Sequence, residues 1–173
     1  LAANDKLVTE FLRSQAGHFA GAQVLLVQLE NNLDAVRSAL QLAEQHGLLR
    51  VLNPAPMHGD LDAGLLAHCD VITPNETEFA LLLDRLAGDH VPAAQVSGMS
   101  DRALHDSCRK LGVATCVITL GSSGCFVSHD PGNLRGDGES HYRVAAENVH
   151  AIDTTGAGDA FSGALVATLS NTA

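Results

Sequence analysis

Basic residues are scarce in this sequence. Its 173 residues include 10 Lys and Arg against 20 Asp and Glu, which gives a formal net charge of −10. This balance argues against nonspecific binding to nucleic acid or to anionic membrane surfaces, because both require a surplus of positive charge. A protein this acidic that handles phosphate groups is expected to hold them with backbone N–H groups and bound cations, not with a basic patch.

The sequence also lacks the spacings typical of zinc-binding and redox motifs. Its four cysteines form no CxxC pair and its nine histidines form no HExxH arrangement, which argues against a dedicated transition-metal site. The cysteines have mostly apolar neighbours, so we expect buried or half-buried free thiols in a reducing compartment. They are Cys69, Cys108, Cys116 and Cys125.

Long hydrophobic runs are missing as well. No segment reaches the roughly 18 apolar residues that a membrane-spanning helix needs. Asn4, Asp5 and Lys6 interrupt the start before the apolar core of a signal peptide develops. We therefore expect a cytoplasmic protein. The sequence begins with Leu1 instead of Met and stops within an apolar helix at Ala173, which indicates a piece of a longer protein.

What the sequence does contain is an alternation of apolar runs with amphipathic segments. Repeated strand–helix–strand units predict an α/β fold, with a mainly parallel sheet and helices on both of its faces. Ligands of such sheets bind beyond the carboxyl ends of the strands. The composition of residues 88–98 is that of a surface loop. Strands are expected at residues 23–29, 48–52, 71–73, 115–120, 125–128 and 141–144, and helices at 33–46, 61–67, 76–86, 101–111 and 159–169.

The strongest chemical signal is the segment 151–161, AIDTTGAGDAF, in which a strand end leads into two glycines and then an apolar helix. The first N–H groups of a helix have no partner within it, and its N-terminus carries a partial positive charge. Gly156, Ala157 and Gly158 would therefore form a cradle for a phosphoryl oxygen. Asp159 would sit beside this cradle, where it can accept the proton of an attacking hydroxyl group.

Each candidate residue also has a purely structural interpretation. The glycines could only shape a tight turn and Asp159 could only complement the helix dipole, because a short glycine motif alone is weak evidence. Asn75 and Glu78 are favourable residues for the first turn of a helix. Glu30 could be a solvated residue at a strand end. The stretch 119–124 could be a plain connection between two strands.

Taken whole, the segment 151–161 resembles the C-terminal signature of the ribokinase/PfkB carbohydrate kinase family, DTxGAGDxF. Four further segments resemble segments of the ribokinases in this family, and they follow one another in the family's order along nearly the whole chain. These segments are Leu26–Glu30 (LVQLE), Leu52–Pro56 (LNPAP), Thr73–Glu78 (TPNETE) and Thr119–Gly124 (TLGSSG).

The resemblance implies a role for each matching residue in catalysis and sugar binding. Asp159 corresponds to the base that deprotonates the 5-hydroxyl group of ribose, and it also contacts the sugar. Gly156, Ala157 and Gly158 correspond to the anion hole that holds the transferring phosphoryl group. Glu30 corresponds to a carboxylate that binds the sugar.

The resemblance also implies sites for nucleotide and cations. Glu78 corresponds to a residue that organises Mg²⁺ through water, which agrees with the preference of this ion for oxygen ligands and retained waters. Asp153 and Thr155 correspond to two contributors to a monovalent cation site, usually K⁺. The residues that correspond to ATP contacts are Asn75, Thr119, Leu120, Gly121, Ser122, Ser123, Gly124 and Gly158.

The family implies a three-layer, Rossmann-like ribokinase fold, here incomplete, as a single partial catalytic domain over residues 1–173. The opening strands, the lid, the N-terminal sugar-binding part and the C-terminal tail would be missing. The implied reaction is ATP-dependent phosphorylation of D-ribose at the 5-hydroxyl, by a full-length protein that forms homodimers and uses Mg²⁺ and K⁺. Two alternatives stay open: another sugar or nucleoside kinase of the family, and a truncated, catalytically inactive paralogue.

Overall fold

The computed structural model describes residues 4–132, 138–149 and 152–171. Its helices and strands alternate over most of the chain, as the sequence predicts. The helices are α1 (Thr9–Ser14), α2 (Leu33–Gln45), α3 (Ala63–Leu66), α4 (Glu76–Leu82), α5 (Ala93–Val96), α6 (Asp101–Lys110) and α7 (Ala157–Ser170). The strands are β1 (Val24–Gln28), β2 (Leu49–Asn53), β3 (Val71–Ile72), β4 (Thr115–Thr119), β5 (Cys125–His129) and β6 (His141–Val144). Short segments of tighter or wider helix lie at Asn4–Lys6, Ala16–Gly21, Leu83–Ala87 and Gly121–Ser123.

The strands form one sheet in the order β1-β2-β3-β4-β5-β6. The first four strands are parallel to one another, whereas β5 and β6 run antiparallel to their neighbours. The carboxyl ends of β1 to β4 therefore meet at one edge, and Gln28 of β1 lies beside Asn53 of β2. The predicted α/β fold with a mainly parallel sheet is confirmed.

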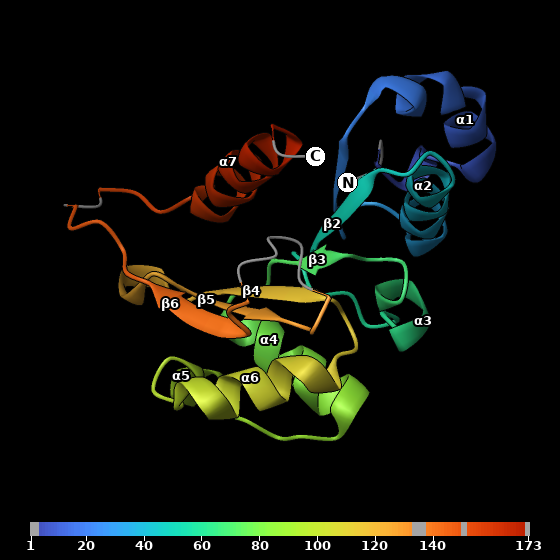
Figure 1. Ribbon diagram of the computed structural model, residues 1–173. Coiled ribbons are helices and arrows are strands. Elements are labelled where there is room, and N and C mark those ends of the chain that lie inside the picture. The colour runs from blue at the N-terminus through green and yellow to red at the C-terminus, as the bar shows by residue number, and fades with distance from the viewer. Residues whose placement is uncertain (1–3, 133–137, 150–151, 172–173) are drawn as a thin grey trace.

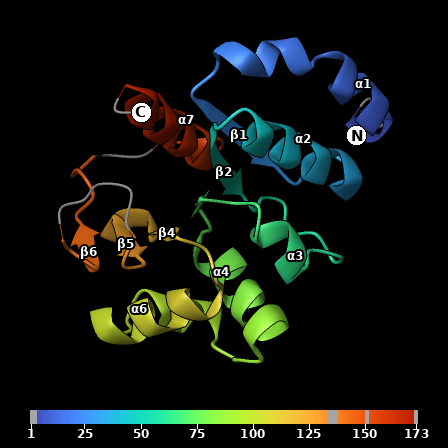
Figure 2. The ribbon, with the colours of Figure 1, turned by 45° about the vertical axis from the view of Figure 1, so that its right-hand side comes forward.

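Helices cover both faces of the sheet, which gives the three layers (Figure 1). On one face the core contains Leu40 of α2, Phe79 of α4 and Leu104 of α6. On the other face α7 packs against the sheet near β1, as Figure 2 shows. This second core is smaller and consists of Val51, Val71, Val117, Cys125 and Val127, with Phe161, Leu165 and Val166 of α7 packed against them.

Helix caps explain where the main helices begin. The Asn32 side chain accepts a hydrogen bond from the N–H of Ala35 at 2.8 Å and starts α2. The Ser100 hydroxyl accepts the N–H of Ala103 at 3.3 Å and starts α6, as predicted. Such caps satisfy N–H groups that have no partner within the helix.

Two segments differ from the sequence-based expectation. The stretch 88–98 is not only a surface loop, because it contains α5, whose Val96 is fully buried in the core. Val91 and Ala93 of this stretch also pack against the same core, so tertiary packing selects apolar residues that the loop-like composition does not single out. Residues 4–21, for which no element was predicted, form α1 and two short 3₁₀ segments, and α1 packs beside α2.

All four cysteines are free and buried, in agreement with the sequence analysis. Burial raises the pKa of Cys69 to about 12, because a thiolate is poorly solvated in an apolar interior. Thiols in this state react slowly with oxidants and electrophiles.

Candidate active site

Two adjoining cavities lie at the carboxyl ends of the parallel strands, where α7 begins. The smaller has a volume of about 170 Å³ and is lined by Glu78, Gly156 and Asp159, among others. The larger has a volume of about 410 Å³, and Gly121, Gly124 and Phe161 contribute to its walls. Both cavities share four lining residues, so together they make one continuous site. The shared residues are Asn75, Thr119, Ala157 and Gly158.

The N-terminus of α7 opens into this site. Gly156 is its N-cap and has a φ of +75°, a conformation that favours glycine, and no side chain caps the helix there. The N–H of Ala157 donates to the Thr154 carbonyl at 3.1 Å, and the N–H of Ala160 donates to Gly156 at 2.9 Å. The amides of Gly158 and Asp159 lie between these two, in the first turn, where helix geometry provides no intrahelical acceptor.

Asp159 lies in the same turn as these amides and lines the smaller cavity. Its side chain is exposed, and its Oδ1 accepts a hydrogen bond from the Gln28 amide at 2.7 Å. The other oxygen, Oδ2, lies 3.9 Å from the position that a Cβ on Gly156 would occupy. The carboxylate is thus held from one side and faces the glycine turn with the other.

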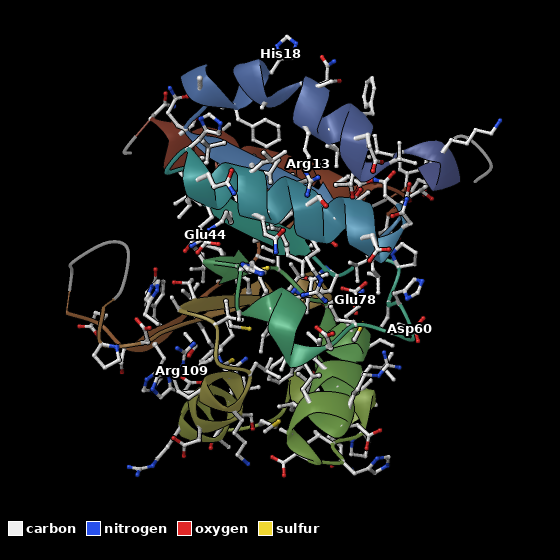
Figure 3. The ribbon with its side chains drawn as sticks, turned by 90° about the vertical axis from the view of Figure 1, so that its right-hand side faces the viewer. Arg13, His18, Glu44, Asp60, Glu78 and Arg109 are labelled. Atoms are coloured by element: carbon white, nitrogen blue, oxygen red, sulfur yellow. The ribbon has the colours of Figure 1, made fainter. Side chains whose placement is uncertain are left out.

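Asn75 and Glu78 form a reciprocal capping box at the start of α4. The Asn75 Oδ1 accepts the N–H of Glu78, and the Glu78 Oε2 accepts the N–H of Asn75, both at 2.9 Å. Glu78 is only 8% exposed, and Figure 3 shows it in the interior, whereas His18 and Asp60 lie at the periphery. Burial raises the pKa of Glu78, an effect only partly offset by the hydrogen bonds from Asn75. The structural and functional interpretations of this pair are compatible, because both residues line the smaller cavity.

A buried polar cluster fixes α7 on the sheet. Ser162 is 1% exposed, and its hydroxyl accepts the Asn53 amide at 3.0 Å and lies 3.3 Å from the Thr73 hydroxyl. The Asn53 Oδ1 also accepts the N–H of Ala55 at 3.1 Å. The ends of β2 and β3 are therefore tied to the first turns of α7, which sets the position of the glycine turn relative to the strands.

The loop 119–124 forms one wall of the larger cavity. Its backbone closes on itself, because the N–H of Leu120 donates to Gly124 at 2.8 Å. Gly124 has a φ of +88°, and a Cβ there would lie 1.9 Å from the Val144 carbonyl oxygen. Thr119, Gly121 and Gly124 line the cavity. The Leu120 side chain lies in the core, and Ser122 and Ser123 are exposed outside the cavity lining.

Glu30 lies apart from Asp159. It is exposed, and it lines a third cavity of about 300 Å³ with Asn31 and residues of β1 and α2. Gln28 is the link between the two carboxylates, because it lines the cavity of Glu30 and donates to Asp159.

Asp153 and Thr155 lie just before the glycine turn and are exposed. The Asp153 Oδ1 accepts the N–H of Thr155 at 2.8 Å, which holds the pKa of Asp153 below its usual range. An ionised carboxylate is thus fixed next to the glycine turn. Ala151, with which the motif begins, lies outside the described residues.

In the described ranges, no group of three or more His, Cys, Asp or Glu side chains is arranged to hold a metal ion. None of the helices that the structure describes has both the length and the apolar character needed to cross a bilayer.

Sequence reasoning overlooked several residues that shape the site, namely Gln28, Ser162 and the segment 144–146. Gln28 and Ser162 could have been noted as polar residues in otherwise apolar segments. For the segment 144–146, no local signal exists, because it reaches the larger cavity only through the pairing of β6 with β5.

The chain is similar to known carbohydrate kinases. A family model described as pfkB family carbohydrate kinase matches residues 2–173. Ribokinase of Haemophilus influenzae is 38% identical over 167 residues, which are 96% of this chain and 49% of that protein. Deoxyribokinase of Salmonella typhi is 34% identical over 163 residues, which are 93% of this chain and 47% of that protein.

Among solved structures, ribokinase of Cryptococcus neoformans in complex with ADP matches with a TM-score of 0.68 and 27% identity. The match covers 89% of this chain and 49% of that one. The chain thus spans about half the length of the relatives that it matches.

Proposed function

The chain belongs to the pfkB family of carbohydrate kinases, and on that basis we propose that it is the catalytic and nucleotide-binding part of an ATP-dependent kinase. The proposed reaction transfers the γ-phosphoryl group of ATP to the 5-hydroxyl of D-ribose. One observation carries the proposal: Asp159 lies in the first turn of α7 and lines a small cavity together with Gly156 and Gly158, and a larger cavity adjoins it.

Asp159 is the proposed general base. As the sugar hydroxyl attacks phosphorus, the O–H proton passes to a carboxylate oxygen of Asp159, the new O–P bond forms, and the bond to ADP breaks. Charge that develops on the transferring group would meet the first-turn N–H groups of Gly158 and Asp159 and the positive end of α7. This division of labour suits phosphoryl transfer, in which positioning and electrostatic stabilisation supply most of the rate enhancement.

The larger cavity is the proposed site of the adenosine part of ATP. Its volume of about 410 Å³ lies within the usual range of small-molecule sites, and glycine-rich backbone and Phe161 line it. Asn75 and Gly158 line both cavities, so a nucleotide in the larger one would direct its phosphates toward Asp159. The Cryptococcus relative, whose solved structure holds ADP, supports nucleotide binding here.

Glu78 fits a role toward Mg²⁺. Its Oε2 is engaged by the N–H of Asn75, which leaves Oε1 for a water molecule or a cation. Its buried carboxylate has a raised pKa, and a nearby cation would offset the cost of ionising it. Mg²⁺ bound with the nucleotide would neutralise charge on the phosphates. Asp153 and Thr155 are the proposed contributors to a K⁺ site next to the cradle.

Ribose is the proposed sugar because a ribokinase is the more similar of the two relatives compared above, at 38% identity against 34% for the deoxyribokinase. Deoxyribose is the second candidate. The sugar would lie between Glu30 and Asp159, with the rest of its contacts supplied by sequence beyond this chain. For the complete protein we further propose a cytoplasmic location, consistent with its buried free thiols, and a homodimer.

The test is an ADP-release assay on the longest natural polypeptide that carries this sequence, called the carrier polypeptide below. Ribose, deoxyribose, fructose and a set of nucleosides are compared at equal concentration. We expect the highest kcat/KM with ribose. A preference for deoxyribose would support the second candidate. Nucleotide binding without turnover on any acceptor would contradict the proposed kinase activity and favour an inactive paralogue.

A further inference from the structure

Polar side chains stand at the carboxyl ends of neighbouring strands, on the face that α7 covers. Val24 and Leu26 of β1 pack on that face, in the smaller core. Because side chains alternate along a strand, Gln28 points to the same face two residues later. On β2, the same alternation places the Asn53 side chain on the same face as Val51. On this face, the apolar residues of each strand are thus followed at its carboxyl end by one polar residue, which faces the start of α7.

Both of these polar residues contact α7, three residues apart on the same side of the helix. Asn53 donates to Ser162, and Gln28 donates to Asp159. Residues spaced by three share one face of an α-helix. The Asn53 contact is buried and fixes the helix, whereas the Gln28 contact is made to the exposed carboxylate at the cavity. In both contacts a side-chain amide at the end of a strand donates to a residue of α7. Ser162 is a buried residue that fixes the helix, whereas Asp159 is the proposed base.

The direction of the Gln28 hydrogen bond is fixed by its partner. An ionised carboxylate only accepts hydrogen bonds, so the Gln28 amide presents its NH₂ group. The distance of 2.7 Å is typical of a charge-assisted hydrogen bond. Since this bond engages Oδ1, the carboxylate is prevented from turning freely about its last bond. Oδ2, near the Gly156 turn, is the oxygen that is left for a substrate.

We propose that Gln28 is a positioning residue for Asp159, an inference that rests on the proposed function. By engaging Oδ1, its amide leaves Oδ2 of Asp159 to receive the proton, and it keeps Oδ2 directed toward the proposed phosphate cradle. Gln28 also lines the cavity of Glu30, so it joins the expected sugar side of the site to the base. Small displacements of a reacting group lower the rate strongly, and a base with a free rotation would spend much of its time misdirected.

The test compares Gln28→Met and Gln28→Glu with the parent carrier polypeptide. Methionine keeps the length and removes the donor, so we expect kcat to fall by about 10- to 100-fold, with the KM for ATP within about twofold of the parent. Glutamate keeps the shape but places a second carboxyl group beside Asp159. Two carboxyl groups at this distance share a proton, so the acidic limb of the pH–rate profile should move to higher pH. The methionine variant should show no such movement.

Gln23→Met is the matched control, since Gln23 lies just before the first residue of the same strand and its side-chain amide donates to the Gly21 carbonyl at 3.4 Å. We expect parental kcat and thermal stability from it. If Gln28 only filled space, both variants at this position would keep kcat within about threefold of the parent, and the glutamate variant would keep the parental pH–rate profile. That result would overturn the proposal.

A readout that does not depend on turnover separates this inference from the proposed function. In the ¹⁵N NMR spectrum, the side-chain amide of Gln28 should shift in Asp159→Asn, whereas that of Gln23 should not. A parent without turnover on any acceptor would contradict the kinase proposal. An unchanged Gln28 resonance would contradict the contact itself, and with it the positioning role.

Discussion

Gly124 is a position at which a single added methyl group should disturb the proposed nucleotide cavity. Its φ of +88° and ψ of −129° form a conformation that residues with a Cβ rarely adopt. A Cβ would also lie 1.9 Å from the carbonyl oxygen of Val144 and 2.7 Å from the N–H nitrogen of Ala146. Both obstacles are backbone atoms, so no side-chain rotation relieves the clash.

The cost of Gly124→Ala follows from these two effects. Holding alanine in a rarely populated backbone conformation costs about 1–3 kcal/mol, and displacing the neighbouring backbone costs about 1–3 kcal/mol more. The lower entropy of the unfolded alanine chain returns about 0.4–1 kcal/mol. We expect a net loss of about 1–5.6 kcal/mol, or about 2–22 °C in Tm for a domain of this size. The affinity for ATP should fall as well, because the displaced segment 144–146 lines the cavity.

Gly121→Ala is the matched control in the same loop. Gly121 has a φ of +54°, within the ordinary left-handed region, and nothing lies within 4 Å of an added Cβ. The left-handed conformation costs about 1–2 kcal/mol, and the lower entropy of the unfolded chain again returns part of this cost. We therefore expect a loss of about 1 kcal/mol and a smaller effect on ATP affinity than that of Gly124→Ala. The assays are thermal unfolding and calorimetric titration with ATP. Equal losses in the two variants, or a loss below about 1 kcal/mol for Gly124→Ala, would refute the reasoning.

Three further predictions concern the carrier polypeptide. Asp159→Asn should lower kcat by roughly 10²- to 10⁴-fold while ATP affinity changes little; turnover within about threefold of the parent would exclude Asp159 as the base. Glu78→Gln keeps an acceptor for the N–H of Asn75, so it should fold, but titration of kcat with Mg²⁺ should show a higher requirement for the ion. Burial raises the pKa of Glu78, so the parent loses stability as the pH rises through that pKa and the carboxyl group ionises, whereas the glutamine variant has no such group. The Tm of the variant minus that of the parent should therefore be larger at pH 8 than at pH 5. Finally, replacing Na⁺ with K⁺ should raise turnover, and Asp153→Asn should abolish the difference; equal turnover in both salts would contradict the K⁺ site.

Local sequence features determined most of the secondary structure. Apolar runs and their period give the strands of the sheet, and the capping residues Asn32, Ser100 and Asn75 give the starts of three helices. These features are predictable because capping and side-chain alternation act between residues only a few positions apart. The family signature at 151–161 likewise places Asp159 next to a glycine turn without reference to the rest of the chain.

Burial in the connecting segments was not predictable in the same way. Val96 lies in a stretch with the composition of a surface loop, and the packing of α5 against α4 makes it part of the core. Leu120 lies within a loop that resembles a nucleotide-binding segment, yet its side chain points into the core. The composition of a segment does not show which of its residues are buried, because burial depends on the neighbours that each side chain has in the folded structure.

The sequence by itself determined which residues could carry chemistry, because their types and short spacings suffice for a phosphate cradle, a capping box and a carboxylate base. Only the tertiary structure decided which of them meet. Gln28 and Asp159 are 131 positions apart, and Asn53 and Ser162 are 109 apart. Their contacts follow from the strand order, the register of β1 with β2 and the face on which α7 packs. A shift of one residue in that register would turn Gln28 to the opposite face of the sheet, away from Asp159.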